Sequence, residues 1–496
     1  MLPTVTRIHI VGGGLAGSEA AWQAASTGVP VTLYEMRPVR PTAVHQTDGL
    51  AELVCSNSFR GDKLDNAVGL LKEEMRRLNS LVMRAADIAR VPAGAALAVD
   101  RQKFSAEVTR VIESHPLIIL HREEVPRIPS VDGPLVIATG PLTSDSLSAD
   151  IASLVGAAHL YFYDAISPIV LADSIDRTKV FRASRWSRSL RGPVPVAAGP
   201  TEEIDVSGMD ATVDRDGAWP PAGPACGTDD GEGDYLNCPF TADEYRRFYE
   251  ALMSAAKAPL HEFDDPRFFE GCLPIEVMAS RGVDTLRFGP MKPVGLPDPR
   301  TGRDAYAIVQ LRQDNLAASH YSLVGFQTQM KWGEQARVLP LIPGLENAEF
   351  VRFGMIHRNT YINGPTMLRG TWQMHGRDNL FFAGQISGVE GYVESAASGL
   401  IAGRNAAAIA QGRAPSEPPR TTAIGALGYY VSHAEPKHYQ PSNITFGIIP
   451  PLVREPGGPR VPKKKAERNE RLSRRALADL DGWLAIHDAR TAQRIP

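Results

Sequence analysis

Residues 7–19 read Arg7-Ile8-His9-Ile10-Val11-Gly12-Gly13-Gly14-Leu15-Ala16-Gly17-Ser18-Glu19. An apolar strand that runs into glycines at 12, 14 and 17, followed by an alanine-rich helix, is the dinucleotide-binding fingerprint. The first glycine permits a tight turn, the second lets backbone N–H groups approach a pyrophosphate, and the third lets helix and strand pack closely. The residues predicted to hold a dinucleotide at the helix N-terminus are therefore Gly12, Gly13, Gly14, Leu15, Ala16 and Gly17.

Three further segments extend this fingerprint. The apolar run 29–34 ends at Glu35, where a carboxylate can hold ribose hydroxyls. Residues 135–141 form another apolar strand that ends at a glycine turn. Far downstream, the strand 379–383 enters a glycine-rich turn before a helix that begins near Glu394. In this return segment the predicted cofactor-binding residues are Gly384, Gln385, Gly388, Gly391 and Tyr392.

The fingerprint and the return segment predict an α/β fold with a Rossmann-type FAD-binding domain that is split in sequence. We expect residues 1–150 and 345–412 to form this three-layer domain, and residues 151–344 to form a smaller inserted α/β domain that faces the substrate. Within the insertion, residues 202–234 hold ten acidic residues and one basic residue, which predicts a loosely held segment. Residues 413–496 are expected to be a basic helical extension, with an apolar stripe at Leu472, Leu477 and Leu480.

The composition excludes several classes of protein. Lys+Arg 53 against Asp+Glu 56 gives 53 − 56 = −3 over 496 residues, so a nucleic-acid ligand would need positive charge gathered on one face. No apolar stretch approaches the ~20 residues of a transmembrane helix, and we expect a cytoplasmic protein. The four cysteines show no C-x-x-C and no metal-ligand spacing, so no metal site is expected.

Two of these cysteines stand in distinctive contexts. Cys55 lies in Glu52-Leu53-Val54-Cys55-Ser56-Asn57, and Cys238 lies in Tyr235-Leu236-Asn237-Cys238-Pro239-Phe240. A Thr-x-x-Glu capping box at Thr241 follows Cys238 and predicts a helix there. A thiol just before a helix N-terminus is favoured as a thiolate, although most cysteines are small buried hydrophobes.

Taken together, these segments resemble the bacterial folate- and FAD-dependent tRNA (uracil-5-)-methyltransferases, within the wider glucose-inhibited division protein A-like flavoproteins. The matching stretches are I-V-G-G-G-L-A-G-S-E-A-A (10–21), Y-E-M-R-P (34–38), A-E-L-V-C-S-N-S-F-R (51–60), Y-L-N-C-P-F (235–240), F-G-P-M-K-P-V-G-L (288–296), M-I-H-R-N-T-Y-I-N (355–363) and A-G-Q-I-S-G-V-E-G-Y-V-E-S (383–395). The acidic stretch before Tyr235 departs from the family pattern.

The resemblance implies methylation of a T-loop uridine of tRNA at C5, with tRNA and folate as the partners and no obligate protein partner. It implies FAD as the cofactor, methylenetetrahydrofolate as the carbon donor, and NADPH or NADH as the reductant. Because C5 of uracil is a poor nucleophile, the reaction needs a thiolate that adds to C6 and a base that removes the C5 proton. We expect Cys55 and Cys238 to be this pair, with the two roles unassigned.

Other residues are candidates for substrate contacts. The segment before the return strand places His357, Arg358 and Tyr361 near the expected flavin, where they could meet folate. Arg281, Arg287 and Lys292 flank Phe288 and are expected to form a basic rim for the substrate. Lys72, Arg76, Arg77 and the basic C-terminal helix were further candidates for an RNA-binding patch.

Two alternatives remain at the level of sequence. One is the related flavoprotein that modifies wobble uridines together with a second protein, although those chains have a longer helical C-terminal domain. The other is a flavin-containing RNA-binding or redox-sensing protein without methyl transfer.

Overall fold

The computed structural model describes residues 6–42, 44–156, 159–187, 233–258, 273–299, 301–454 and 461–492. Of these, residues 159–165, 356–359 and 488–492 are described by their backbone alone. Almost all of the acidic stretch 202–234 lies outside the described residues.

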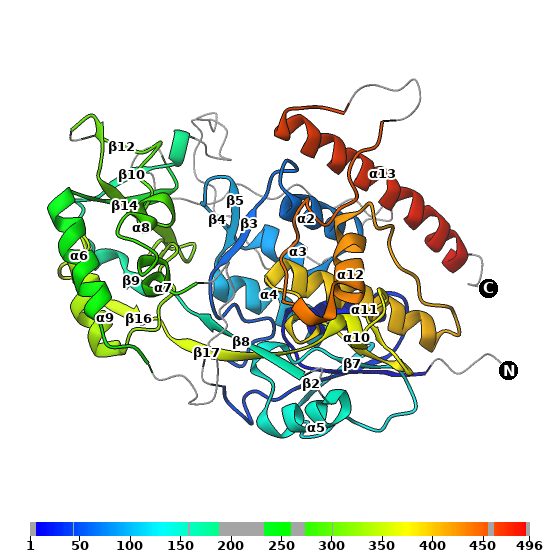
Figure 1. Cartoon of the computed structure of the whole chain (residues 1–496). Helices are drawn as coiled ribbons and strands as arrows, with labels where there is room; N and C mark the ends of the chain where they lie inside the picture. Colours follow the sequence, from blue (N-terminus) through cyan, green and yellow to red (C-terminus); the bar gives the residue numbers. More distant parts are fainter. Residues whose placement is uncertain are drawn as a thin grey trace, which may run out of the picture.

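Two sheets dominate the molecule (Figure 1). The first, called the parallel sheet below, has the order β18-β19-β7-β1-β2-β6. Its strands are β1 (Ile8–Val11), β2 (Val31–Glu35), β6 (Ile118–Arg122), β7 (Leu135–Ile137), β18 (Gln373–Met374) and β19 (Arg377–Phe382). Only β18 runs antiparallel to its neighbour in this sheet. Strand β19 of the return segment pairs with β7, which in turn pairs with β1 of the fingerprint. The two segments therefore belong to one sheet, which confirms the predicted split Rossmann-type fold.

Two helices pack tightly against each other beside this sheet. They are α1 (Leu15–Ser26) and α11 (Tyr392–Ala410), so the second helix begins two residues before the expected Glu394. A Cβ atom on Gly403 would lie 2.5 Å from the carbonyl oxygen of Ala20, and one on Gly399 would collide with Ala16. Small residues therefore let the two helix backbones approach and bring the two halves of the fold together.

The second sheet, called the antiparallel sheet below, has the order β10-β11-β14-β15-β9-β16. Its strands are β9 (Ile169–Leu171), β10 (Phe181–Ala183), β11 (Tyr235–Phe240), β14 (Ala307–Gln313), β15 (His320–Leu323) and β16 (Phe350–Arg352). Strand β16 lies beyond the predicted domain boundary at residue 344. Four helices contribute to a second hydrophobic core with this sheet: α6 (Ala242–Ser254), α7 (Ile275–Ala279), α8 (Thr285–Phe288) and α9 (Trp332–Val338). The capping box predicted at Thr241 is present at the start of α6.

A two-stranded ribbon joins the two sheets. Strand β8 (His159–Ala165) leads out of the parallel-sheet unit, and β17 (Ile356–Ile362) returns to it, paired antiparallel along seven residue positions. Figure 1 shows this ribbon crossing between the two halves of the molecule. Short elements complete the second half: α8 (Thr285–Phe288), β12 (Pro297–Asp298) and β13 (Arg303–Asp304).

The remaining elements surround the parallel sheet and residues 52–57, called the Cys55 segment below. They are β3 (Ser58–Gly61), α2 (Ala67–Arg77), α3 (Leu81–Ile88), β4 (Arg90–Val91), β5 (Ala96–Val99), α4 (Arg101–Ser114), α5 (Asp145–Val155), α10 (Gly364–Met367) and α12 (Ala423–His433). The last helix is α13 (Lys465–Ala492). Its Leu472, Leu477 and Leu480 are buried in the hydrophobic core around the parallel sheet, which confirms the predicted apolar stripe.

Candidate functional site

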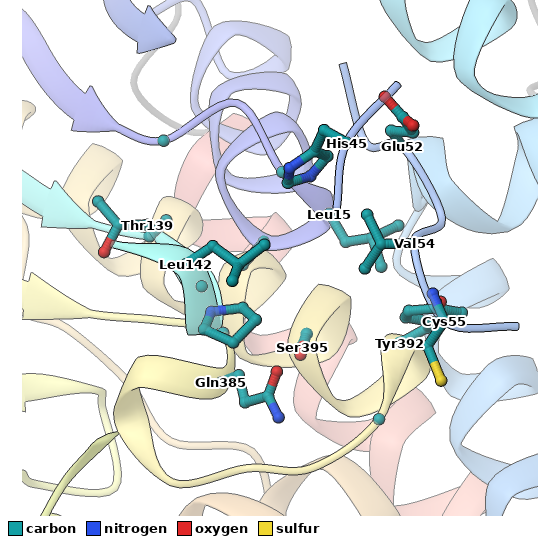
Figure 2. A pocket seen from close by; sticks show the side chains of 18 of the residues that line it. Leu15, His45, Glu52, Val54, Cys55, Thr139, Leu142, Gln385, Tyr392 and Ser395 are labelled. Carbon is teal, nitrogen blue, oxygen red and sulfur yellow. The ribbon is translucent and has the colours of Figure 1, made fainter. Parts of the chain in front are cut away.

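A cavity of about 400 Å³ lies where the two sheets meet. The fingerprint turn, the Cys55 segment, the turn after β19 and the face of the antiparallel sheet all contribute to its lining. Figure 2 shows Cys55 and Tyr392 on one side of this cavity, with Thr139 and Leu142 on the opposite side. Of the predicted cofactor-binding residues, those that line it are Gly12, Gly14, Leu15, Ala16, Glu35, Gly384, Gln385, Gly391 and Tyr392.

A different structural reason explains the glycine at each of positions 12, 14 and 17. Gly12 has φ +104, and a Cβ there would lie 2.5 Å from the carbonyl oxygen of Ala138 on the neighbouring strand. A Cβ on Gly17 would collide with the carbonyl of Gly12, so helix and strand approach too closely for any side chain. By contrast, a Cβ on Gly14 would meet no described atom within 4 Å. Gly14 therefore leaves open space where a ligand can approach the backbone.

Glu35 is fixed at the end of β2. Its Oε2 accepts a hydrogen bond from the backbone N–H of Gly13 at 3.0 Å, and its Oε1 pairs with Nε of Arg37 at 2.8 Å. Burial alone would raise the pKa of this carboxyl, but Arg37 and the backbone N–H groups lower it overall. Glu35 is therefore an ionised hydrogen-bond acceptor at the cavity wall. Gly13 itself is absent from the lining and faces Glu35 and Leu50.

The turn after β19 brings positive-φ glycines to the cavity. Gly384 has φ +77 and Gly391 has φ +107, and both contribute to the lining. Gly388 does not line the cavity, because it packs against the ring of Tyr439. A Cβ on Gly384 would lie 3.0 Å from Cβ of Ala16, so this turn brings its backbone to the cavity beside the fingerprint helix, whereas its middle glycine is needed for packing.

Tyr392 holds the Cys55 segment in place. Its hydroxyl oxygen accepts hydrogen bonds from the backbone N–H groups of Cys55, at 2.8 Å, and Ser56, at 3.0 Å. Burial raises the pKa of Tyr392, so its hydroxyl stays protonated at neutral pH. The first residue of α11 therefore fixes the backbone next to the Cys55 thiol.

Three arginines far apart in the sequence surround the same segment. Arg101 donates to the carbonyl oxygen of Leu53 at 2.5 Å and pairs with Asp314 at 3.0 Å. Arg352 donates to the carbonyl oxygen of Val54 at 3.1 Å. Burial and the charge of Arg101 lower the pKa of Arg352 to about 10.

Arg312 completes this arginine cluster and also lines the cavity. It donates to Oδ1 of Asn57 at 2.8 Å and to Oγ of Ser56 at 2.7 Å. Because Arg312 and Arg352 donate to uncharged oxygen atoms here, the cluster places positive charge around the Cys55 segment, which favours an anionic group nearby. None of the three was predicted from the sequence, since no local motif marks them.

Cys238 occupies a different environment from Cys55. It lies on β11 opposite Val309, its exposed fraction is 0 %, and its side chain belongs to the second hydrophobic core. Burial raises the pKa of its thiol. Side chains alternate along a strand, and Tyr235 on the other face of β11 pairs with the cavity-lining Arg312. The described structure therefore places the Cys238 thiol on the face of the antiparallel sheet opposite the cavity.

The candidate folate residues are only partly described. The side chains of His357 and Arg358 lie outside the described residues. Tyr361 is buried against Tyr439 and does not line the cavity. The structure therefore brings none of the described candidates of this group to the cavity wall.

The predicted basic rim lies outside the cavity lining. Arg281 and Lys292 are exposed, and Arg287 stacks on the ring of Tyr306 at 3.7 Å while pairing with Asp284. These residues therefore remain candidates for an outer surface rather than the cavity wall.

The expectation that Lys72, Arg76 and Arg77 form an RNA-binding patch is wrong. Lys72 is fully buried and pairs with Asp62 at 3.1 Å. Arg76 pairs with Asp87 at 2.8 Å, and Arg77 pairs with Asp481 of α13 at 2.7 Å. Acidic partners outside α2 therefore neutralise this cluster and join α2 to its neighbours.

Within the described ranges, no helix is long and apolar enough to cross a bilayer. Those same ranges contain no group of three or more His, Cys, Asp or Glu side chains arranged to bind a metal ion.

The split parallel sheet, the fingerprint turn and the cavity define a Rossmann-type FAD-binding fold. A family described as "Glucose inhibited division protein A" matches residues 7–192 and 220–414. The solved structure of GidA from Aquifex aeolicus is similar with a TM-score of 0.61 at 17% identity, covering 96% of this chain and 76% of that one. At this identity the likeness concerns the fold alone.

Curated relatives are much closer in sequence. The methylenetetrahydrofolate–tRNA-(uracil-5-)-methyltransferase TrmFO of Enterococcus faecalis is 53% identical over 471 residues, covering 95% of this chain and 97% of that protein. The protein of the same name from Heliobacterium modesticaldum is 53% identical over 478 residues, covering 96% and 98%. The chain therefore belongs to the methylenetetrahydrofolate–tRNA-(uracil-5-)-methyltransferase family, within the wider glucose inhibited division protein A family.

Proposed function

We propose that this protein methylates C5 of the T-loop uridine of tRNA, with methylenetetrahydrofolate as carbon donor and NADPH or NADH as reductant. The single observation that carries the proposal is 53% identity to a relative of that name across 95% of the chain. The position of Cys55 in a cavity next to a dinucleotide fingerprint supports it. We further propose that the protein acts in the cytoplasm and needs no obligate protein partner.

The residues of the cavity fit FAD. Gly14 offers open backbone at the start of α1, where unpaired N–H groups favour a pyrophosphate. Glu35 stands at the end of β2, where an ionised carboxylate can accept from ribose hydroxyls. Gly384 and Gly391 bring the backbone of the return segment to the cavity wall. When bound there, FAD supplies the redox chemistry that turns a one-carbon unit into a methyl group.

Of the two cysteines that the structure describes, Cys55 is the one that lines the cavity. A uracil that enters the cavity would meet a cysteine whose backbone is held by Tyr392 and Arg352. Either role of a thiol in this reaction, addition to C6 or acceptance of the C5 proton, needs such a fixed side chain. Positive charge from the arginine cluster would favour the enolate oxygen that develops when a nucleophile adds to C6.

Cys238 stays part of the proposal as the second thiol. Its buried position means that it can meet the uracil only after β11 or the elements packed on it rearrange. A bound tRNA is the natural source of the energy for such a change, since binding energy can drive conformational closure. Loss of the cavity-lining thiol and loss of the buried thiol are therefore expected to have different effects on activity and stability.

The proposal is tested with purified protein, tRNA that lacks 5-methyluridine, and methylenetetrahydrofolate labelled in its methylene carbon. We expect label in 5-methyluridine of the T-loop, dependent on reductant, with NADPH and NADH compared in parallel. Label at the wobble uridine would favour the related class of flavoprotein. Protein that holds FAD but transfers no label would contradict the proposal.

A further inference from the structure

Two large aromatic side chains in the second half of the molecule are exposed. Phe288 is 81% exposed at the end of α8, and Trp186 is 59% exposed next to β10. The backbone N–H of Trp186 donates to the carbonyl oxygen of Gly295 at 2.9 Å, and a Cβ on Gly295 would lie 2.7 Å from the indole ring. Trp186 therefore packs on the loop that follows Phe288, called the 288–295 loop below. Exposed aromatic surface of this kind marks an interaction site.

The 288–295 loop is held firmly, so this exposure does not come from a frayed segment. Arg185 donates to the carbonyl oxygen of Lys292 at 3.0 Å. Met291 is fully buried and accepts a hydrogen bond from the N–H of Ile308 on β14 at 3.0 Å. Just before the loop, Arg287 donates to the carbonyl oxygen of Tyr306 at 2.9 Å. The aromatic side chains are thus presented on a fixed scaffold, which lowers the entropy cost of binding.

The backbone at Trp186 supports the same interpretation. Trp186 adopts φ 60 and ψ 27, in the left-handed region that a bulky residue rarely occupies. Such strain persists where surrounding structure enforces it, and it clusters at ligand-binding sites.

The 288–295 loop also lies against the cavity. Gly325 lines the cavity, and a Cβ on Gly325 would lie 2.6 Å from Cβ of Pro290 in the loop. A chain that reaches the cavity past Gly325 would therefore pass this surface.

Two exposed cations lie in and beside the loop, whereas Arg287 between them is paired with Asp284. Lys292 is exposed within the loop, and Arg281 is exposed on the turn that precedes α8. Aromatic rings beside positive charge are what proteins use to bind unpaired nucleotides, because every base can stack while cations contact phosphates. Protein–protein interfaces are depleted in lysine, so an exposed lysine beside the aromatic rings favours RNA over a protein partner.

We propose that Trp186 and Phe288 form a stacking platform for unpaired nucleotides that flank the uridine in the cavity. This inference rests on the proposed function, since it takes RNA as the substrate. It assigns to these two side chains the contact with bases, and to Lys292 a contact with the phosphate backbone.

The test compares Phe288→Ala and Trp186→Ala with Trp332→Ala, which removes a similarly exposed (62%) tryptophan from α9. Binding of a T-arm hairpin and of a blunt RNA duplex of equal length is measured with the FAD-loaded protein. We expect Phe288→Ala and Trp186→Ala each to weaken hairpin binding about 10-fold. We expect duplex binding to change less than about twofold, and Trp332→Ala to change neither. Phe288→Tyr should bind the hairpin like the parent protein.

Salt dependence separates stacking from charge. Phe288→Ala should leave the slope of log affinity against log salt unchanged, whereas Lys292→Ala should reduce it by about 1. Because Phe288 is exposed, its variant keeps the fold, and FAD absorbance checks this for Trp186→Ala.

Three outcomes would overturn the platform. They are unchanged hairpin binding in both alanine variants, an equal loss for hairpin and duplex, and tighter hairpin binding in either alanine variant. Failure of the proposed function looks different: the parent protein would bind the hairpin but form no 5-methyluridine from the labelled donor.

Discussion

The segments around Cys55 and Cys238 match the same family in sequence, yet the structure gives them opposite surroundings. Cys55 lies in a polar segment at the cavity wall, held by Tyr392 and the arginine cluster. Cys238 is fully buried in an apolar core, and burial raises the pKa of its thiol. A cysteine can therefore stand in a family-specific motif and still be buried where it cannot react without rearrangement. In the described structure only the first thiol is placed to act.

The largest expected effect is that of Cys55→Ala. We expect methylation to fall by at least about 10³-fold, because the variant removes a side chain that acts at the reacting atoms. FAD should remain bound, since the fingerprint turn is untouched. Label transfer into tRNA and the flavin absorbance measure the two properties. The control is Cys226→Ala, which removes a cysteine of the acidic stretch 202–234 that lies in none of the family-matching segments. Parent-like activity of Cys55→Ala would remove this thiol from the mechanism.

Cys238→Ala and Cys238→Ser test the other side of the comparison. Cys238→Ala should lower the free energy of unfolding by about 1–2 kcal/mol, because it leaves a small hole in the core. We expect both variants to lose methylation by at least about 100-fold while FAD stays bound. Chemical denaturation and label transfer separate the two effects.

The serine variant is the more decisive of the two. A folded, FAD-bound Cys238→Ser protein without activity would show that the thiol reacts, and hence that the antiparallel sheet rearranges during the cycle. Full activity of Cys238→Ala would show that Cys238 takes no part in the reaction. The reacting groups would then all have to lie in the cavity.

Arg312 links the two regions, because β14 pairs with the Cys238 strand and its arginine holds Ser56 and Asn57. We expect Arg312→Ala to lower kcat about 10–100-fold through misplacement of the Cys55 segment. Arg312→Lys should recover part of kcat, since one charged donor remains, although the forked geometry is lost. Measurements of kcat and of KM for tRNA in both variants show whether Arg312 acts on the chemical step or on tRNA binding. A change in KM for tRNA alone would mark Arg312 as a binding residue instead.

Much of the fold could be predicted from the sequence because its determinants are local. The strand, glycine turn and alanine-rich helix at residues 7–26 are contiguous, and the return segment repeats the pattern. The close packing of α1 against α11 was not predicted, because it joins Ala20 to Gly403 across most of the chain.

The candidate site was less predictable for the same reason. Arg101, Arg312 and Arg352 meet around one short segment, but each stands alone in sequence. The misjudged cluster at Lys72 shows the converse, since a row of basic residues cannot reveal that Asp62 and Asp87 neutralise it. The face on which Cys238 lies depends on the pairing register of β11, which the local sequence leaves open.

The most direct test of the central claim, that Cys55 is the thiol of the cavity, is an alkylation map of the folded protein. A small alkylating reagent is added near neutral and at mildly alkaline pH, and each cysteine is followed by mass spectrometry alongside methylation activity. We predict that modification of Cys55 parallels the loss of activity. Because burial raises its pKa, Cys238 should stay protonated and unmodified at both pH values until the protein unfolds. Modification of Cys238 before Cys55, or inactivation while Cys55 stays intact, would contradict the claim.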